Sequence, residues 1–453
     1  MNEADAGIVG NHGPLTGVRV LELGSLIAGP LASRILADFG AEVIKVEPDK
    51  GDPLRTWGKA TLHGSLWSMV QSRNKKTICL NLDAEPDREI VRRLAAQCDV
   101  VVENFRPGRL EAWGLGYEDL KRANPDLIMV RISGYGQTGP YREKPGFGNI
   151  AESMGGIRYI TGFPDQPPVR VGLSLGDSVA ALYSVIGALL ALYWRDGAAH
   201  RRWRADGSAG PEGSAGPEGS AVPEGSAVPE RSAVPERSAV PEGGAPPGRG
   251  QMVDVALTEA VFSLLEGILP EYGADGTVRE RQGNLLSGAA PSNMYPTREG
   301  QWFAIGANAD GIFRRFAAAI GRPELTRDPR FADGRSRVAN ARALDAMIAD
   351  WTRLHTPEEL SRILDAAGVP AGPVYSIADI ARDPQFLARN MILHVADERL
   401  GEIVMPGVVP TLSETPGAVR WAGQGVGAHN KEVLGSLLGL SDEQIEALKT
   451  ERG

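Results

Sequence analysis

The sequence predicts an α/β protein with a large Rossmann-like domain, built on a mostly parallel sheet, and a smaller α/β domain. Strand-like and helix-like stretches alternate along the first part of the chain, which is typical of a parallel sheet with helices on both faces. The chain has 453 residues, more than the roughly 250–300 at which a single core stops growing. From about residue 280 the pattern changes to a smaller α/β unit.

The chain begins with a βαβ unit. Residues 18–23 form a strand-like run that Gly24 closes, a helix is expected from Gly29-Pro30 to about residue 39, and 41–47 form the next strand. Proline favours a first helical turn, where its missing N–H has no partner to lose. The glycines at 24 and 29 lack the G-x-G-x-x-G spacing of a dinucleotide site. We therefore expect a Rossmann-like fold without that nucleotide.

More strands and helices follow in alternation. Strand-like runs lie at 77–82, 99–103 and 127–132, helical stretches at 87–96, 117–123 and 178–193, and a strand leading to a helix at 250–268. The most apolar run, 173–194, includes Asp177 and predicts a core helix rather than a membrane span. The smaller unit is expected to contain strands near 293–296 and 301–306 and helices at 310–320, 340–353 and 357–367. The tail of the chain is expected to add a strand at 402–405 and a helix at 430–438.

Six hexapeptide repeats between residues 207 and 242, of the type Gly-Ser-Ala-Val-Pro-Glu, interrupt this pattern. They have almost no apolar area to bury, so they cannot offset the entropy lost on ordering. The predicted organisation is a large domain (1–200), a disordered insertion (201–248), a linking strand and helix (249–279), a small domain (280–385) and a return to the large domain (386–453).

Composition excludes several classes of function. The net charge of −9 argues against nucleic-acid binding, which needs a basic field, although a local basic pocket could form from Arg73, Lys75, Lys76 and Arg106. The two cysteines and six scattered histidines lack the spacing of metal ligands, so no metal site is predicted. The acidic start, Met-Asn-Glu-Ala-Asp-Ala, lacks the features of a signal peptide. A soluble cytoplasmic protein without membrane partners is expected.

Asp177 lies between a glycine-flanked strand and the long apolar helix, in Gly172-Leu-Ser-Leu-Gly-Asp177. One interpretation is structural, because aspartate is a preferred helix N-cap residue. The other is chemical, because a carboxylate presented at such a turn can attack a thioester.

The sequence resembles the family III coenzyme A transferases, the CaiB/BaiF type, along nearly its whole length apart from the repeats. The resemblance rests on motifs that are weak singly and specific in their order. They are Val18–Glu47 with Ala28-Gly29-Pro30, Asn74-Lys75-Lys76, Val102-Glu-Asn-Phe-Arg-Pro-Gly108, Ser133-Gly-Tyr-Gly-Gln-Thr-Gly-Pro140, Pro167-Pro-Val-Arg-Val-Gly172 with Gly176-Asp177, Gly248-Arg-Gly-Gln-Met-Val-Asp254 and Gly368-Val-Pro-Ala-Gly-Pro373.

The resemblance implies that Asp177 is the catalytic nucleophile. Its carboxylate would attack an acyl-CoA to give a mixed anhydride, and the released thiolate would then form an aspartyl-CoA thioester. The incoming acceptor acid would take the same steps in reverse. Coenzyme A is thus a substrate, with no permanently bound cofactor, and an interlocked homodimer is implied. Residues that match the family's CoA-contacting positions are Ile27, Ala28, Gln71, Ser72, Arg73, Asn74, Lys75, Asn104, Phe105 and Arg106.

Departures from the motifs of other branches narrow the range of reactions that we expect. The formyl-CoA/oxalate branch has a glutamine where Ile27 stands and an arginine where Pro48 stands, and its glycine run corresponds to Leu286–Ser292. Formyl-CoA and oxalate are therefore not expected. The 2-methylacyl-CoA racemase branch uses a His-Asp pair where this chain has Phe147-Gly148, and neither residue can move a proton. A racemase, or a non-catalytic CoA-binding scaffold, is the alternative to a transferase.

The segments 146–156 and 289–296 look like the branch that uses succinyl-CoA and dicarboxylic acids such as malate, citramalate or glutarate. A second carboxylate on the acceptor calls for a fixed cationic group. Arg170 and Arg158 are the candidates for this substrate contact. The alternative is that each pairs with a nearby acid, such as Asp165 or Glu152.

Overall fold

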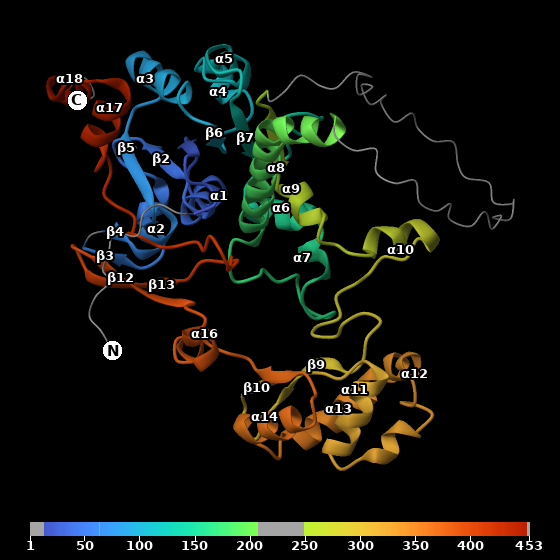
Figure 1. The fold of residues 1–453 in the computed structure, drawn as a ribbon. Coiled ribbons are helices and arrows are strands. Elements are labelled where there is room, and N and C mark those ends of the chain that lie inside the picture. Colours follow the sequence, from blue (N-terminus) through green and yellow to red (C-terminus); the bar gives the residue numbers. More distant parts are fainter. Residues whose placement is uncertain (1–12, 63, 207–248, 451–453) are drawn as a thin grey trace, which may run out of the picture.

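The large domain is built on a parallel sheet (Figure 1). The computed structural model describes residues 13–62, 64–206 and 249–450. Within them, the sheet has six strands in the order β5-β2-β1-β6-β7-β8, and every neighbouring pair is parallel. The predicted fold class is confirmed. The strands are β1 (Arg19–Glu22), β2 (Glu42–Glu47), β5 (Lys75–Cys79), β6 (Val100–Glu103), β7 (Ile128–Ser133) and β8 (Met252–Ala256).

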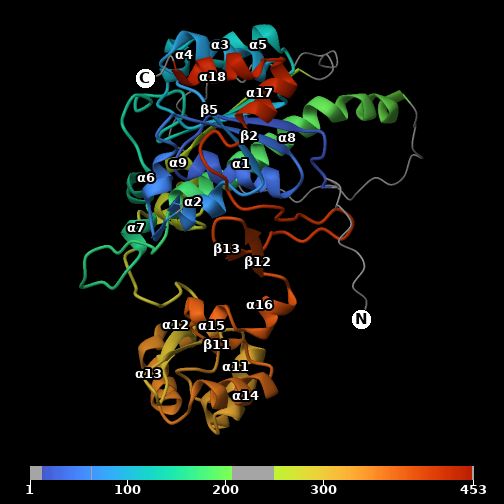
Figure 2. The ribbon, with the colours of Figure 1, turned by 90° about the vertical axis from the view of Figure 1, so that its left-hand side faces the viewer.

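Helices cover both faces of this sheet, because its strands alternate buried apolar side chains between the two sides. Val20 and Val100 belong to one core cluster, and their neighbours Leu21 and Val101 belong to the other. Figure 2 shows one helical layer above the sheet and another below it. The upper layer contains α3 (Glu85–Ala95), α4 (Arg109–Ala112), α5 (Tyr117–Ala123), α17 (Asn430–Leu438) and α18 (Asp442–Thr450); the lower contains α1 (Ala28–Asp38), α2 (Leu66–Gln71), α6 (Gly148–Met154) and α9 (Leu257–Phe262).

The helix α8 (Leu175–Asp206) links β7 to β8 and packs against α1, α6, α9 and both strands. A helix that connects two parallel strands runs antiparallel to them, so α8 starts at the edge where the strands end. Its Leu175–Gly197 part is long and apolar enough to cross a membrane by composition alone. Its contacts with the sheet agree with the predicted core helix.

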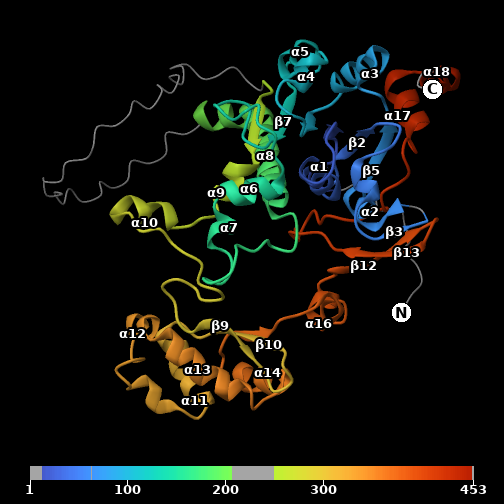
Figure 3. The ribbon, with the colours of Figure 1, turned by 180° about the vertical axis from the view of Figure 1, so that it is seen from behind.

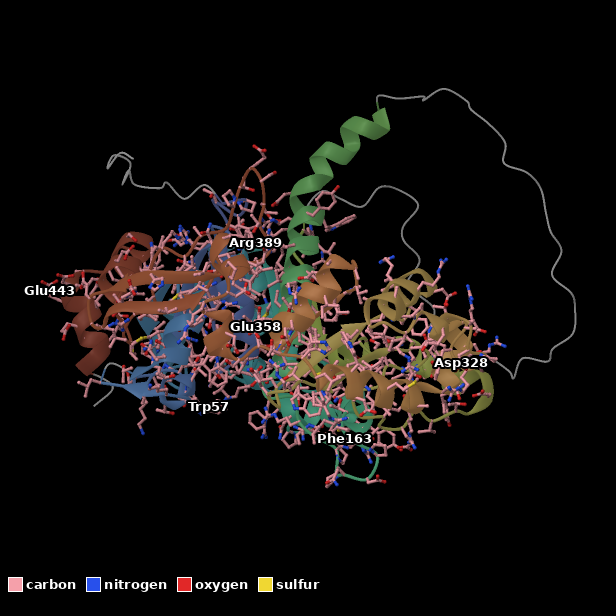
Figure 4. All side chains as sticks on the ribbon, turned by 90° about the horizontal axis from the view of Figure 1, so that it is seen from below. Trp57, Phe163, Asp328, Glu358, Arg389 and Glu443 are labelled. Carbon is pink, nitrogen blue, oxygen red and sulfur yellow. The ribbon has the colours of Figure 1, made fainter. Side chains whose placement is uncertain are left out.

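The smaller unit surrounds an antiparallel sheet in the order β11-β10-β9. Figure 3 shows it below the large domain, joined through the segment between α10 and β9 and through α16. Figure 4 places Asp328 of this unit and Glu443 of α18 at opposite ends of the molecule. Its elements are β9 (Ser292–Pro296), β10 (Trp302–Gly306), α11 (Asp310–Ala319), α12 (Gly334–Ala339), α13 (Ala341–Thr352), α14 (Pro357–Ala366) and β11 (Ala371–Pro373).

Some elements differ from the sequence prediction. The helix expected to reach residue 268 ends at Phe262. Glu266, within the predicted range, has a positive φ of 49°, which a regular helix does not allow. The strand predicted at 402–405 pairs with a strand that the sequence pattern did not indicate. The remaining elements are β3 (Ala60–Thr61), β4 (Gly64–Ser65), α7 (Ile157–Ile160), α10 (Ile268–Asp275), α15 (Ile377–Ile380), α16 (Pro384–Ala388), β12 (Ile392–Asp397) and β13 (Gly401–Pro406), with 3₁₀ turns at Pro53–Thr56 and Pro323–Thr326.

The predicted insertion at 201–248 is described only at its start, where α8 continues to Asp206. The repeats lie outside the described residues. The residue limits predicted for the domains stay predictions.

A buried ionic cluster joins the first strands to the turn that follows β1. The Lys45 ammonium donates to Glu22 at 2.7 Å, to Asp52 at 2.8 Å and to the Gly24 carbonyl at 3.0 Å. Lys75 donates to the other Glu22 oxygen and to the Pro30 carbonyl, each at 2.7 Å. Burial alone would lower the pKa of Lys45, but Glu22 and Asp52 raise it above the usual lysine value. Lys45 is therefore charged in the interior.

We predict that Lys45→Met destabilises the fold, because it leaves Glu22 and Asp52 buried without their shared cation. Removing one partner of a buried ion pair typically costs about 3–5 kcal/mol. The matched control is Lys76→Met, since Lys76 pairs with Glu42 and Glu432 on a more exposed surface, where a pair is worth about 0–1 kcal/mol. Urea unfolding measures both variants. Equal losses of unfolding free energy in the two variants would show that the buried cluster contributes no more to stability than the more exposed pair.

Candidate active site

The crevice at the carboxyl ends of β1 and β6 is the expected ligand site, because the chain leaves these neighbouring strands toward opposite sides of the sheet. The β1–α1 turn lies against Asn104 there. The Asn104 side chain accepts from the Ser25 N–H at 2.8 Å and donates to the Ser25 carbonyl at 2.9 Å. A Cβ at Gly24 would lie 3.0 Å from the Asn104 Oδ1 atom, so glycine allows this close approach.

The β1–α1 turn is held in an uncommon conformation. Leu26 has a φ of 63°, which is rare for a residue with a branched side chain. Its N–H donates to the Asp52 carboxylate at 3.0 Å, and Asp52 in turn pairs with Lys45. The predicted contact residues Ile27 and Ala28 follow directly, and both side chains are buried. Any ligand at this turn therefore meets its backbone more than these two side chains.

The predicted CoA-contacting segment 71–75 lies inside the protein. Arg73 pairs with Asp38 at 2.7 Å, Asn74 donates to Asp38 at 2.8 Å, and Lys75 binds Glu22. Burial lowers the pKa of Lys75 to about 8, although Glu22 opposes the shift. Ser72 is buried as well, while the Gln71 Oε1 atom is buried without a hydrogen-bond partner in the described chain. The basic groups of this segment are therefore already paired with buried acids of the protein. The predicted role of the segment in CoA binding stays a prediction.

The other predicted basic residue is placed differently. Arg106 is exposed, three residues after the end of β6. Its neighbour Phe105 packs edge to face with Trp113, at 5.3 Å between ring centroids. The structure therefore brings together, at the carboxyl ends of the central strands β1 and β6, the residues Ile27, Ala28, Asn104, Phe105 and Arg106.

Asp177 lies in the first turn of α8, because this helix begins at Leu175. The interpretation of Asp177 as the N-cap is therefore wrong. Its carboxylate lies against α6: a Cβ built on Gly148 would be 2.1 Å from the Asp177 Oδ2 atom. Gly176 also approaches Gly148, since a Cβ on Gly176 would be 2.8 Å from the Gly148 carbonyl. Glycines at both positions leave room for the carboxylate.

Glu152 forms the other side of the site, and sequence reasoning did not assign it a functional role. Its carboxylate is buried, accepts from the Gly176 N–H at 3.3 Å, and pairs with Arg158 at 3.3 Å and with Arg170 at 3.9 Å. Both arginines thus pair with a nearby acid, Glu152, as the alternative interpretation of the sequence had it. The sequence did offer one signal for this pairing: Glu152 in α6 and Arg158 in α7 are only six residues apart.

These neighbours set the acidity of Asp177. Burial raises the pKa of the Asp177 carboxyl to about 6, the negative charge of Glu152 adds to the rise, and Arg170 opposes it. A carboxylate of raised basicity that is still ionised at neutral pH is well suited to nucleophilic attack. No cluster of potential metal ligands occurs in the described part of the chain.

Comparisons with known proteins match the chain to one family. The family model of CoA-transferase family III matches residues 15–200 and 243–430, which leaves out all six repeats. A succinyl-CoA–D-citramalate CoA-transferase of Chloroflexus aurantiacus is 48% identical over 97% of this chain and 98% of its own. The beta subunit of a succinyl-CoA–L-malate CoA-transferase of the same organism is 39% identical over 97% and 98%. A crystal structure of a CaiB/BaiF family protein from Brucella suis has a TM-score of 0.73 at 32% identity, covering 94% of this chain and 100% of that one.

We predict that Asp177 makes stability depend on pH. With a folded-state pKa of about 6 and a usual value near 3.9, the folded protein holds a proton that the unfolded chain has lost between these pH values. This stabilisation is present at low pH and is lost as the pH rises through about 4 to 6. Relative to Asp177→Asn, the wild type should lose up to roughly 3 kcal/mol over that range. Urea unfolding across the range measures it, and parallel pH curves would contradict the shift.

Proposed function

The chain belongs to CoA-transferase family III, and we propose that it moves CoA from succinyl-CoA to a dicarboxylic acid through covalent intermediates on Asp177. The observation that carries this proposal is the Asp177 carboxylate, which lies partly buried at the carboxyl edge of the sheet with two arginines nearby. The two Chloroflexus relatives act, by their names, on succinyl-CoA with D-citramalate or L-malate. Malate, citramalate and glutarate are therefore the acceptors to test first.

The proposed reaction keeps the acyl group activated throughout. The Asp177 carboxylate attacks the thioester carbonyl, the C–S bond breaks, and a mixed anhydride and the CoA thiolate result. The thiolate attacks the aspartyl carbonyl and releases succinate, which leaves an aspartyl-CoA thioester. The acceptor carboxylate attacks that carbonyl and expels the thiolate again. The thiolate then attacks the acceptor's acyl carbonyl, which frees Asp177 and forms the new acyl-CoA. Each difficult exchange is thus divided into easier steps.

CoA binding is proposed at the edge that carries the β1–α1 turn. The backbone of Ile27 and Ala28, with Asn104 and Phe105, would line the thioester end. The Gln71 Oε1 atom, buried without a hydrogen-bond partner in the described chain, is a further acceptor proposed for this site. Arg106 is exposed and suits a phosphate, which arginine binds through paired donors. Ser72, Arg73, Asn74 and Lys75 would support this surface from behind.

The acceptor's second carboxylate is proposed to bind Arg170, with Arg158 beside it. Arg170 has half of its side-chain surface exposed, and it makes no hydrogen bond within the described residues. Arg158 is more enclosed and is held by two contacts to Glu152. Arg170 is therefore the arginine that is free to bind a substrate.

The racemase alternative needs an acid–base pair next to the substrate. Phe147 is 63% exposed, and Gly148 lies against the Asp177 carboxylate with no titratable side chain. Proton abstraction beside the thioester has no base at these positions. The transferase is the better-supported reaction.

A homodimer in the cytoplasm is also proposed. The helix α8 exposes Leu182, Ile186, Leu190 and Tyr193 along one side, and a contiguous apolar stripe of this kind marks a protein interface. The family resemblance implies an interlocked homodimer, and a second copy is the proposed cover of this stripe. Neither Cys79 nor Cys98 forms a disulfide within the described residues, which is in keeping with a reducing compartment.

We predict that Asp177→Asn abolishes CoA transfer while the protein remains folded, since an amide cannot form the anhydride. The assay supplies succinyl-CoA and labelled L-malate or D-citramalate and detects the new thioester. Hydroxylamine trapping of the wild type should mark Asp177 as an aspartyl hydroxamate by mass spectrometry. Transfer by Asp177→Asn at the wild-type rate would exclude the nucleophile, and epimerisation without transfer would favour the racemase.

We predict that Arg170→Met weakens dicarboxylates selectively. A hydrogen bond to a charged group is worth about 1.5–3 kcal/mol, so the preference for L-malate over butyrate should fall roughly ten- to hundred-fold. The KM for succinyl-CoA is the internal comparison. It should rise together with the KM for L-malate, because the donor also carries a distal carboxylate. Equal losses for L-malate and butyrate would make Arg170 structural, and Arg158→Met would then be the next variant to measure.

A further inference from the structure

Glu152 is a buried carboxylate beside the nucleophile that the proposed reaction does not consume. Only about 1% of its side-chain surface is exposed, and its position is fixed from two sides. One oxygen, Oε1, accepts from the Gly176 N–H at the start of α8, and the other, Oε2, faces both arginines. A buried charge of this kind persists only where cations compensate it.

The two arginines are bound to Glu152 with unequal firmness. Arg158 reaches Oε2 through both Nε and Nη2, at 3.4 and 3.3 Å, and keeps 25% of its side chain exposed. Arg170 reaches the same oxygen through Nε at 3.9 Å and is 51% exposed. The Arg170 contact uses the Nε edge of the guanidinium. Its two terminal nitrogens, a pair that can bind a carboxylate through two parallel bonds, have no hydrogen-bond or ion-pair partner in the described chain.

We propose that Glu152 is a positioning residue for the transfer reaction, which orients the Arg170 guanidinium beside Asp177 so that its two terminal nitrogens receive the distal carboxylate of a dicarboxylic substrate. This inference rests on the proposed function and names the residue that sets its substrate class. Glu152 touches no reacting atom. It acts through Arg170, and through Gly176 on the turn that carries Asp177.

Glu152 also acts electrostatically on Asp177. Among the described residues, the charged side chains that act on the Asp177 carboxyl are Glu152 from α6 and Arg170 from the loop before α8, and α1 and α9 contribute none. Arg158 of α7 acts through Glu152. The two groups have opposite effects on the pKa of Asp177, which Glu152 raises and Arg170 lowers. Removing each one should therefore shift the acid limb of the pH–rate profile in opposite directions.

The test compares Glu152→Gln and Arg170→Gln with the wild type, with Glu118→Gln on the distant α5 surface as a matched control. Glutamine keeps the size of Glu152 and its acceptor for the Gly176 N–H but removes the charge. For Glu152→Gln we expect the KM for L-malate to rise about ten-fold, the change that one bond to a charged group produces, with a smaller effect on kcat and on butyrate. The acid limb of kcat/KM should move to lower pH in Glu152→Gln and to higher pH in Arg170→Gln.

Glu152→Asp keeps the charge at a shorter reach, so it should raise the KM for L-malate and leave the acid limb near its wild-type position. If Glu152→Gln fails to fold, this variant and Arg170→Gln still test the proposal. An unchanged acid limb in Glu152→Gln, or equal losses for L-malate and butyrate, would overturn it. A wild-type protein that transfers CoA to none of L-malate, D-citramalate and glutarate would instead exclude the proposed function.

Discussion

The buried ionic cluster around Lys45 is the constraint on which the site depends. Its ammonium joins Glu22 on β1, Asp52 after β2 and the Gly24 carbonyl. Asp52 then accepts from Leu26, whose left-handed backbone would otherwise be unfavourable. Isolated buried charges are costly, so such a cluster is compatible with the fold only when every member is placed. It therefore links sheet assembly to the shape of the β1–α1 turn.

The position of Asp177 follows from the same sheet. The crossover from β7 to β8 makes α8 antiparallel to the strands, so the first turn of α8 lies at the edge that also carries the β1–α1 turn and Asn104. Gly148 and Gly176 let the Asp177 carboxylate approach α6. Partial burial and Glu152 then raise its basicity. Chain topology and small residues thus place the carboxylate, and its neighbours set its chemistry.

Local pattern was enough to predict the sheet, since β1, β2, β6 and β7 are short apolar runs with clear boundaries. It also placed Asp177 at the start of a long apolar helix, and the contiguous family motif around it made this residue the proposed nucleophile. It could not assign the segment 71–75, in which Arg73 and Lys75 have the composition of a phosphate loop. Their acids, Asp38 and Glu22, are far away in sequence and adjacent only in the fold. The charge relation between Glu152 and Asp177 was hidden for the same reason.

The charges around Asp177 connect the covalent steps to substrate exchange. With Asp177 ionised, the carboxylates of Asp177 and Glu152 balance the two arginines. In the proposed aspartyl-CoA intermediate the Asp177 charge is gone, and the same four residues carry an excess positive charge. A distal carboxylate restores the balance, and in a partly buried site such compensation has more weight than in water. The intermediate that must meet an acceptor is thus the state that attracts a dicarboxylate, whereas return of the Asp177 carboxylate favours release of the product.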